Sequence, residues 1–182
     1  MGQAADDWGS FEAIYRSTYV PVLRFLRRRV AWDDAEDAAA EVFATAWRRR
    51  QDMKGEPLPW LYGIARHVAA NTLRSSGRAA RLSARLLDWS AGEDVRAAED
   101  EVLGRMGAVD ALAQLSPDDR DALMLVSWDG LQTSDAARVM GRSRGAFAVQ
   151  LHRARRRLER AMTEEGLSPD ELSSLALEGR AG

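Results

Sequence analysis

Apolar side chains recur at helical spacing along most of this chain. In the C-terminal third, Phe147, Leu151, Ala154 and Leu158 follow one another at intervals of three or four residues. This spacing places all of them on one buried face of an α-helix. The pattern therefore predicts an all-α protein. The same periodicity predicts helices over residues 11–30, 34–50, 60–78 and 103–115, and a further helix from residue 117 that Asp129 and Gly130 end.

Turn and capping residues divide residues 130–160 into two helices. Thr133 or Ser134 can cap the start of a short first helix, and Gly141 can end it in the left-handed conformation that glycine adopts at low cost. Ser143 is then expected to cap the second helix. Two capped helices with apolar faces and a glycine turn between them predict a helix-turn-helix.

The second helix of this motif has a basic side opposite its apolar face. On an isolated helix such a side is usually only a solvated surface. Here it belongs to a predicted helix-turn-helix, and its side chains are long enough to reach phosphates, so DNA binding is favoured. The residues on this side are Val149, His152, Arg153, Arg156 and Arg160.

The stretch Asp34–Arg50 has its acids early and its arginines late, as the helix dipole favours. Asp37 and Glu41 lie one turn apart on this helix. They either serve solubility and the dipole or form an acidic face that docks a basic helix of another protein. Their spacing does not decide between the two. The apolar face of the helix consists of Val42, Phe43, Ala46 and Trp47.

Residues 51–59 are predicted to be irregular because they contain Gly55, Pro57 and Pro59, and the next helix is expected to begin at Trp60. The predicted buried residues of this helix are Leu61, Ile64, Ala65 and Val68. A polar row follows a second face, where it can hold phosphates or bases or simply be solvated. The row consists of His67, Asn71, Arg74 and Arg78, with Arg66 beside it.

The order of these segments predicts two small helical domains. Residues 1–10 are expected to be a disordered leader, and 11–85 the first domain, with a kink or restart at Pro21. The acidic stretch 86–104 is predicted to be a flexible linker. Ser116 is expected to cap a helix that starts at Pro117, inside a second domain. The second domain covers residues 105–163, and a tail of 164–182 follows with one short amphipathic helix.

Composition excludes several classes of protein. The net charge is −2, so any DNA binding must come from local basic patches and not from the charge of the whole chain. The absence of cysteine excludes disulfides, thiolate metal sites and cysteine nucleophiles. Two histidines do not suggest a metal site, and neither a signal peptide nor a membrane-spanning segment is expected from the sequence. A cytoplasmic protein without metal or cofactor is expected.

Three segments in succession resemble the bacterial sigma factors of the extracytoplasmic-function group. They are DDAEDAAAEVFATAWRRR, PWLYGIARHVAANTLRSSGR, and LSPDDRDALMLVSWDGL continuing into DAARVMGRSRGAFAVQLHRARRRL. The resemblance covers roughly residues 11–162. It implies that region 2 and region 4 domains bind core RNA polymerase and promoter DNA, without separate enzyme activity. It also implies a monomer within the holoenzyme, with an anti-sigma factor as a further partner.

The resemblance also implies a role for each polar surface. Asp37 and Glu41 are expected to dock on the β′ clamp helices, while the second domain contacts the β flap and the linker threads towards the active-site channel. The minus-ten element, opened so that a base of the non-template strand enters a protein pocket, is expected to meet Lys54, Arg66, His67, Asn71, Arg74 and Arg78. The major groove of the minus-thirty-five element is expected to meet Arg142, Ser143, Arg144, Val149, Gln150, His152, Arg153 and Arg156.

The chain departs from the family pattern at two places. Ala40 stands where glutamine is frequent, so one contact to core polymerase is missing. Residues 148–150 are Ala-Val-Gln where a basic-serine-arginine triplet is usual, which weakens direct base reading. Val149 can touch a thymine methyl and Gln150 can pair with adenine. Arg153 and Arg156 are then left mainly to the DNA backbone.

The alternative function is a stand-alone helix-turn-helix regulator that binds duplex operators as a dimer, with its N-terminal helices as a sensor or dimerisation domain. An enzyme is the least expected class, because no nucleophile-base pair, phosphate loop or metal-ligand spacing is visible.

Overall fold

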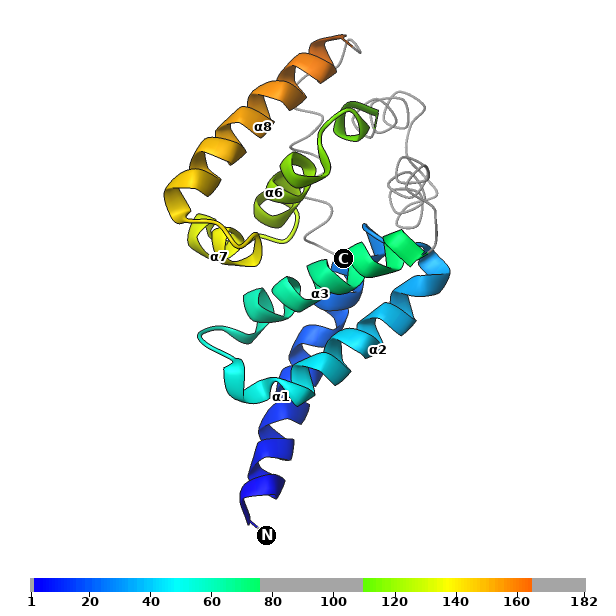
Figure 1. The fold of residues 1–182 in the computed structure, drawn as a ribbon, viewed down its shortest axis with the longest axis vertical. Helices are drawn as coiled ribbons and strands as arrows, with labels where there is room; N and C mark the ends of the chain where they lie inside the picture. Colours follow the sequence, from blue (N-terminus) through cyan, green and yellow to red (C-terminus); the bar gives the residue numbers. More distant parts are fainter. Residues whose placement is uncertain (1, 76–109, 165–182) are drawn as a thin grey trace, which may run out of the picture. The chain divides into compact units, whose positions relative to one another are not determined.

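The computed structural model of the chain describes residues 2–75 and 110–164. Within these ranges every regular element is a helix, which confirms the all-α prediction (Figure 1). The chain divides into two compact units between Ala79 and Ala80, and each is described by itself. The elements are α1 (Gly2–Arg27), α2 (Trp32–Arg48), the 3₁₀ helix η1 (Arg50–Asp52), α3 (Pro57–Ser75), α6 (Pro117–Ser127), α7 (Thr133–Val139) and α8 (Arg144–Glu164).

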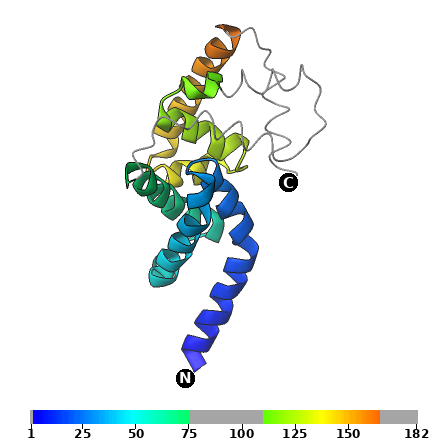
Figure 2. The same ribbon diagram turned by 90° about the vertical axis from the view of Figure 1, so that its right-hand side faces the viewer.

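In the first unit, α1, α2 and α3 each pack against the other two (Figure 2). The rings of Phe25 on α1 and Tyr62 on α3 stack with their centroids 4.7 Å apart, and both side chains are buried. All the residues predicted to be buried on α3 are buried, as are Val42, Phe43 and Ala46 on α2. The helical periodicity of the sequence therefore located this core correctly.

The first helix is longer than the sequence predicts. A disordered leader is expected over residues 1–10, but α1 begins at Gly2. Gln3, Ala4 and Ala5 are good helix formers, and no proline interrupts the chain before Pro21, so the helix can extend to its first residues. Of the kink or restart predicted at Pro21, the restart does not occur, because α1 runs through Pro21 as one element.

The segment between α2 and α3 is more regular than expected. The prolines at 57 and 59 led to the prediction of irregular structure up to residue 59, yet α3 begins at Pro57. The first turn of a helix has no intrahelical partner for its backbone N–H groups, so proline costs little there. Residues 50–52 form η1, which leaves an irregular connection of residues 53–56.

In the second unit, α8 packs against both α6 and α7. The caps predicted for α6 and α8 are present: Ser116 Oγ accepts a hydrogen bond from the Asp119 N–H at 3.2 Å, and Ser143 Oγ accepts one from the Ala146 N–H at 3.2 Å. Gly141 has φ +63°, the left-handed conformation expected at the turn. The helix-turn-helix is therefore formed by α7, Gly141 and α8.

The start of α7 differs from the prediction. Its N-cap is Gln132, whose side chain makes no capping hydrogen bond, and neither Thr133 nor Ser134 occupies that position. The hydrogen bond from the Asp135 N–H to the Gln132 carbonyl, at 2.9 Å, closes the first turn through the backbone. The helix therefore begins one residue earlier than a hydroxyl cap would require.

Arg120 on α6 lies in the core of the second unit, with 8% of its surface exposed. Its guanidinium donates hydrogen bonds to the backbone carbonyls of Leu112, Ala113 and Leu115, at 2.8, 3.0 and 3.1 Å. Helix ends leave such carbonyls without intrahelical donors. Burial lowers the pKa of Arg120, and nearby Asp121 opposes that shift. The Arg120 side chain therefore supplies hydrogen-bond donors to three carbonyls at the end of the preceding helical turn.

Candidate nucleic-acid and protein-binding surfaces

The outward side of α8 is a continuous exposed surface. Phe147, Leu151, Ala154 and Leu158 are buried against α6 and α7, as predicted. On the other side of the helix, 51% of Val149 is exposed, and the basic side chains are exposed as well. This surface, called the outward row of α8 below, consists of Gly145, Val149, His152, Arg153, Arg156 and Arg160, all exposed.

The residues that lead into α8 are also exposed but are partly engaged within the unit. Arg142 forms an ion pair with Asp118 on α6, with 3.0 Å between Nη2 and Oδ2. Both side chains are at least 40% exposed, so the pair can exchange for a phosphate at low cost. Ser143 is used as the cap of α8, and Arg144 is exposed on its first turn.

Gln150, predicted to read bases, lies differently from the outward row. Its side chain is half-buried, and Nε2 donates a hydrogen bond to Asp119 Oδ1 on α6 at 3.4 Å. Arg157, two turns further along α8, forms an ion pair with the same carboxylate. Asp119 is only 5% exposed. It therefore ties α8 to α6, a role that sequence spacing did not reveal because the partners are 31 and 38 residues away.

On α3 the structure brings most of the predicted polar row together. His67, Asn71 and Arg74 are exposed on one face, and Arg66 beside them is half-buried. The Arg74 guanidinium donates a hydrogen bond to Asn71 Oδ1, which orients both side chains along the helix. Arg78, the last member of the predicted row, lies outside the described residues.

The connection of residues 53–56 presents Lys54 to solvent just before α3. Gly55 beside it has φ +78°, a backbone conformation that favours glycine. Met53, before the lysine, is half-buried. The lysine is therefore held on a short, tightly turned segment at the start of the helix that carries His67 and Asn71.

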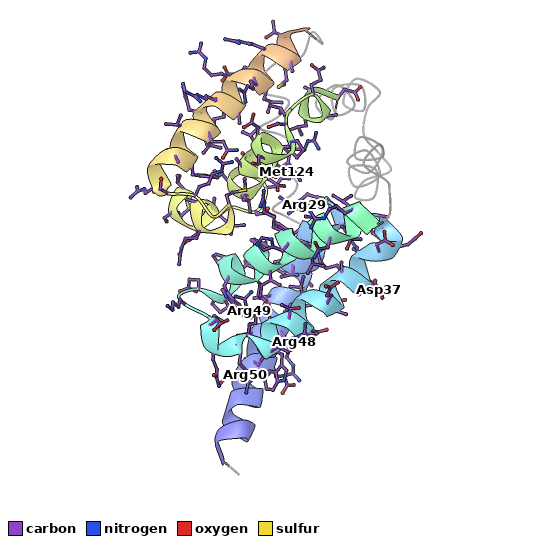
Figure 3. The ribbon with its side chains drawn as sticks, in the orientation of Figure 1. Arg29, Asp37, Arg48, Arg49, Arg50 and Met124 are labelled. Atoms are coloured by element: carbon purple, nitrogen blue, oxygen red, sulfur yellow. The ribbon has the colours of Figure 1, made fainter. Side chains whose placement is uncertain are left out.

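The exposed face of α2 is acidic in the N-terminal part of the helix. Asp37 and Glu41 are both exposed, and neither has a hydrogen bond or ion pair within the described part of the chain. By contrast, Glu36 lies 3.8 Å from the guanidinium of Arg27. Ala40, also exposed, separates the two free acids and adds no polar group. Figure 3 shows Asp37 on α2, well away from the arginines that end the helix.

The arginines around the end of α2 interact within the first unit (Figure 3). The Arg48 guanidinium donates to Thr45 Oγ1 at 2.9 Å, and Arg49 pairs with Asp52 at 3.2 Å. Arg50 stacks on the Trp47 ring, 4.2 Å from its centroid. These side chains close the helix end and extend into η1, consistent with the dipole interpretation of their position.

Neither a metal-ligand cluster nor a spanning helix occurs in the described ranges. No group of three or more histidine, cysteine, aspartate or glutamate side chains there can hold a metal ion. None of the helices there is long and apolar enough to traverse a lipid bilayer.

Comparison with known families matches both units separately. Residues 14–79 match the family described as Sigma-70 region 2, and residues 106–158 match the family described as Sigma-70, region 4. The first match covers α2 and α3 and most of α1, and the second covers the helix-turn-helix. The alternative of a stand-alone helix-turn-helix regulator is not favoured, because it does not account for the first match.

Curated relatives show the same relationship along most of the chain. The ECF RNA polymerase sigma factor SigD of Mycobacterium tuberculosis is 33% identical over 175 residues, which is 89% of this chain and 81% of SigD. The ECF RNA polymerase sigma factor BldN of Streptomyces coelicolor is 32% identical over 169 residues. That alignment covers 88% of this chain but only 62% of BldN.

Two solved structures share the fold. The sigma factor RpoE from Bartonella quintana, solved in complex with the anti-sigma factor NepR, has a TM-score of 0.61 and 23% identity, covering 85% of this chain and 97% of RpoE. CnrH, solved with the cytosolic domain of CnrY, has a TM-score of 0.62 and 20% identity, covering 86% and 90% of the two chains. With both domains matched and SigD aligned over most of its length, the chain belongs to the sigma-70 family as a sigma factor of the ECF group, whose members direct RNA polymerase to promoters.

Proposed function

We propose that this sigma factor docks on the β′ clamp helices of core polymerase through Asp37 and Glu41. Two exposed acids one turn apart, without partners in the described part of the chain, are available to cations of another protein. Charges of this kind determine which partner binds and how fast it associates. The helix that carries them packs on both α1 and α3, so the acids are held on a rigid element.

The second part of the proposal is that Lys54 and the polar row of α3 bind the minus-ten element. Lys54 and Arg74 attract phosphates, while His67 and Asn71 offer a ring that can stack on a base and an amide that can bond to one. Opening the duplex and taking a base out of the stack costs a few kcal/mol. Contacts of the row to the non-template strand therefore have to offset that cost. Arg66 and Arg78 belong to the same proposed surface.

The third part is that α8 enters the major groove of the minus-thirty-five element. The observation that carries this assignment is the outward row of α8, which is exposed on a helix whose other side is fixed in a helix-turn-helix. A recognition helix needs this combination of a held apolar side and a free polar side. Arg142, Ser143 and Arg144 lie at the start of α8, where a recognition helix approaches the DNA.

The remaining contacts follow from the same assignment. The chain acts as a monomer in the cytoplasm, has no enzyme activity of its own, and contacts the β flap through its second unit. Two relatives by fold were solved with an anti-sigma factor or with a cytosolic partner domain, which supports an anti-sigma factor as a regulatory partner of this chain.

The test is in vitro transcription with purified core polymerase, the full-length chain and a library of promoters, followed by sequencing of the transcript starts. Specific starts that depend on the chain are expected, and they should share two sequence elements. Purified chain alone should bind duplex promoters weakly. If it gave no specific starts, yet bound double-stranded operators tightly without polymerase, the regulator function would replace the proposed one.

A further inference from the structure

Residues 148–150 lie in the first two turns of α8, the part of a recognition helix that reaches base edges. Their side chains are placed in three different ways. Ala148 is exposed but ends at Cβ, Gln150 is half-buried, and Val149 is 51% exposed. Sequence reading by this segment therefore depends on which of the three can reach a base.

Gln150 is held inside its own unit. Its Nε2 donates to Asp119 at 3.4 Å, and its Oε1 is buried without a hydrogen-bond partner in the structure. Asp119 is itself 5% exposed and also paired with Arg157. For Gln150 to pair with adenine, its amide would have to break the hydrogen bond to Asp119, and the side chain would have to reorient towards the outward row of α8. Base reading by hydrogen bonds at this position is therefore disfavoured.

Val149 lies at the middle of the outward row. Successive residues of an α-helix are rotated by ~100°, so Val149 lies nearly opposite Phe147, which is fully buried. One turn before it stands Gly145, where an added Cβ would meet no atom within 4 Å. One and two turns after it stand Arg153 and Arg156, both exposed. The outward row is therefore apolar near the start of α8 and cationic beyond it.

An exposed valine offers no donor or acceptor to a base. The apolar feature of the major groove that it can contact is the C5-methyl group of thymine. We propose that, among residues 148–150, Val149 makes the base contact, by packing against a thymine methyl in the minus-thirty-five element. This inference depends on the proposed entry of α8 into that groove. Arg153 and Arg156 then supply phosphate contacts that are independent of sequence.

The test uses holoenzyme and a minus-thirty-five element obtained by selection from a random library. Each thymine of the element is replaced in turn by uracil, which removes only the methyl group. At one thymine, this change is expected to weaken binding about four-fold, the equivalent of ~0.8 kcal/mol for one buried methyl group. A selected element without thymine, or one that binds equally well with uracil at every position, would overturn the inference.

The Val149→Ala holoenzyme completes a double-mutant cycle. It should bind the thymine element about as weakly as wild type binds the uracil element, and should no longer distinguish the two. Gln150→Ala is the matched control and should keep the full preference for thymine. If the Val149→Ala holoenzyme still bound the thymine element four-fold more tightly than the uracil element, another residue would contact the methyl group. The same conclusion would follow if Gln150→Ala lost this preference.

A second pair of variants separates this inference from the proposed function. Arg153→Ala and Arg156→Ala should weaken binding to the thymine and uracil elements equally. Each should also lower the salt slope by about one unit for every phosphate that the variant no longer neutralises. If both variants lower the affinity and the salt slope, while replacement of thymine by uracil leaves the affinity of the wild-type holoenzyme unchanged, the inference about Val149 fails and the groove assignment stands. If they change neither affinity nor salt slope, the groove assignment fails as well.

Discussion

Both units of this chain bury arginine side chains, but the side chains that join their helices differ. In the first, aromatic rings meet between helices: Phe25 stacks on Tyr62, and the rings of Tyr15 and Phe43 meet edge to face with centroids 4.7 Å apart. In the described part of the second, Phe147 is the buried aromatic residue of a largely aliphatic core. Its helices are also joined by polar side chains, notably Asp119 and Arg120.

This difference suits the two proposed tasks. The first unit presents polar groups from two of its helices and must hold them while a base leaves the stack, and large buried rings give a rigid support. The second unit presents one helix, which the buried Asp119 carboxylate ties to α6 through Gln150 and Arg157. Hydrogen bonds to a buried carboxylate have a defined geometry, so they add an orientation of α8 to what aliphatic packing provides.

The largest effect is expected where the first unit meets polymerase. Asp37→Arg combined with Glu41→Arg should abolish association with core polymerase, because two attractive charges become repulsive at a docking surface. Single reversal of Asp37 should weaken binding by roughly 2 kcal/mol or more. Affinity is measured by fluorescence anisotropy of the labelled chain against core polymerase.

The control for this prediction is Glu12→Arg, which reverses an exposed acid on α1 that pairs with Arg16. It should leave core binding within about two-fold, since surface charges outside an interface contribute little. Equal reductions in affinity for Glu12→Arg and Asp37→Arg would show a general charge effect and would contradict the assignment of α2.

The next largest effect tests the polar support of the second unit. Arg120→Met leaves the carbonyls of Leu112, Ala113 and Leu115 without their donor, and the free energy of unfolding of this unit should fall by roughly 2–3 kcal/mol. Hydrogen exchange of the amides in α6 and α8 measures this loss of stability, because peptides from the two units are analysed separately.

Arg142→Met is the matched control, since it removes an arginine from a half-exposed ion pair in the same unit. It should cost less than about 1 kcal/mol. Amides of α1–α3 should exchange at unchanged rates in both variants. Arg120→Met with exchange like wild type would mean that the second unit does not depend on its buried polar links.

The smallest effect compares one glycine from each unit. An added Cβ meets no atom within 4 Å at either Gly63 on α3 or Gly141, but only Gly141 has a positive φ, +63°. Gly63→Ala should stabilise the first unit by about 0.5–1 kcal/mol, because glycine is costly within a helix. Gly141→Ala should destabilise the second by roughly 1 kcal/mol or more. Thermal unfolding monitored by circular dichroism gives the sign of the stability change in each variant. A change of the same sign in both variants would contradict this prediction.

Much of the fold follows from local sequence patterns. The apolar face of α8 is buried because the spacing of its residues places them all on one side of the helix. These residues are Phe147, Leu151, Ala154 and Leu158. The caps at Ser116 and Ser143 follow from side-chain chemistry within three residues. The errors are also local: proline at 57 marks the start of a helix and not its absence, and α1 runs through Gly9 and Ser10 although these residues favour a helix start there.

The candidate site could be predicted only in part, because some of its side chains have distant partners. Gln150 looks like a base-reading residue in the sequence, and only the folded unit shows that it reaches Asp119, 31 residues away. The burial of Arg120 was equally hidden, since its carbonyl partners belong to the preceding helical turn. The exposure of Asp37 and Arg153 is easier to predict, because it requires only that they lie opposite an apolar face.

The outward row of α8 has one consequence for how such proteins diverge. Val149 contributes nothing to the core of its own unit, and replacing an exposed side chain of this kind changes stability by less than about 0.5 kcal/mol. Descendants of a duplicated gene are therefore free to alter this residue with little folding penalty. Under the proposed reading of thymine by Val149, a change of this side chain together with a matching change in the DNA would alter promoter preference without altering the fold.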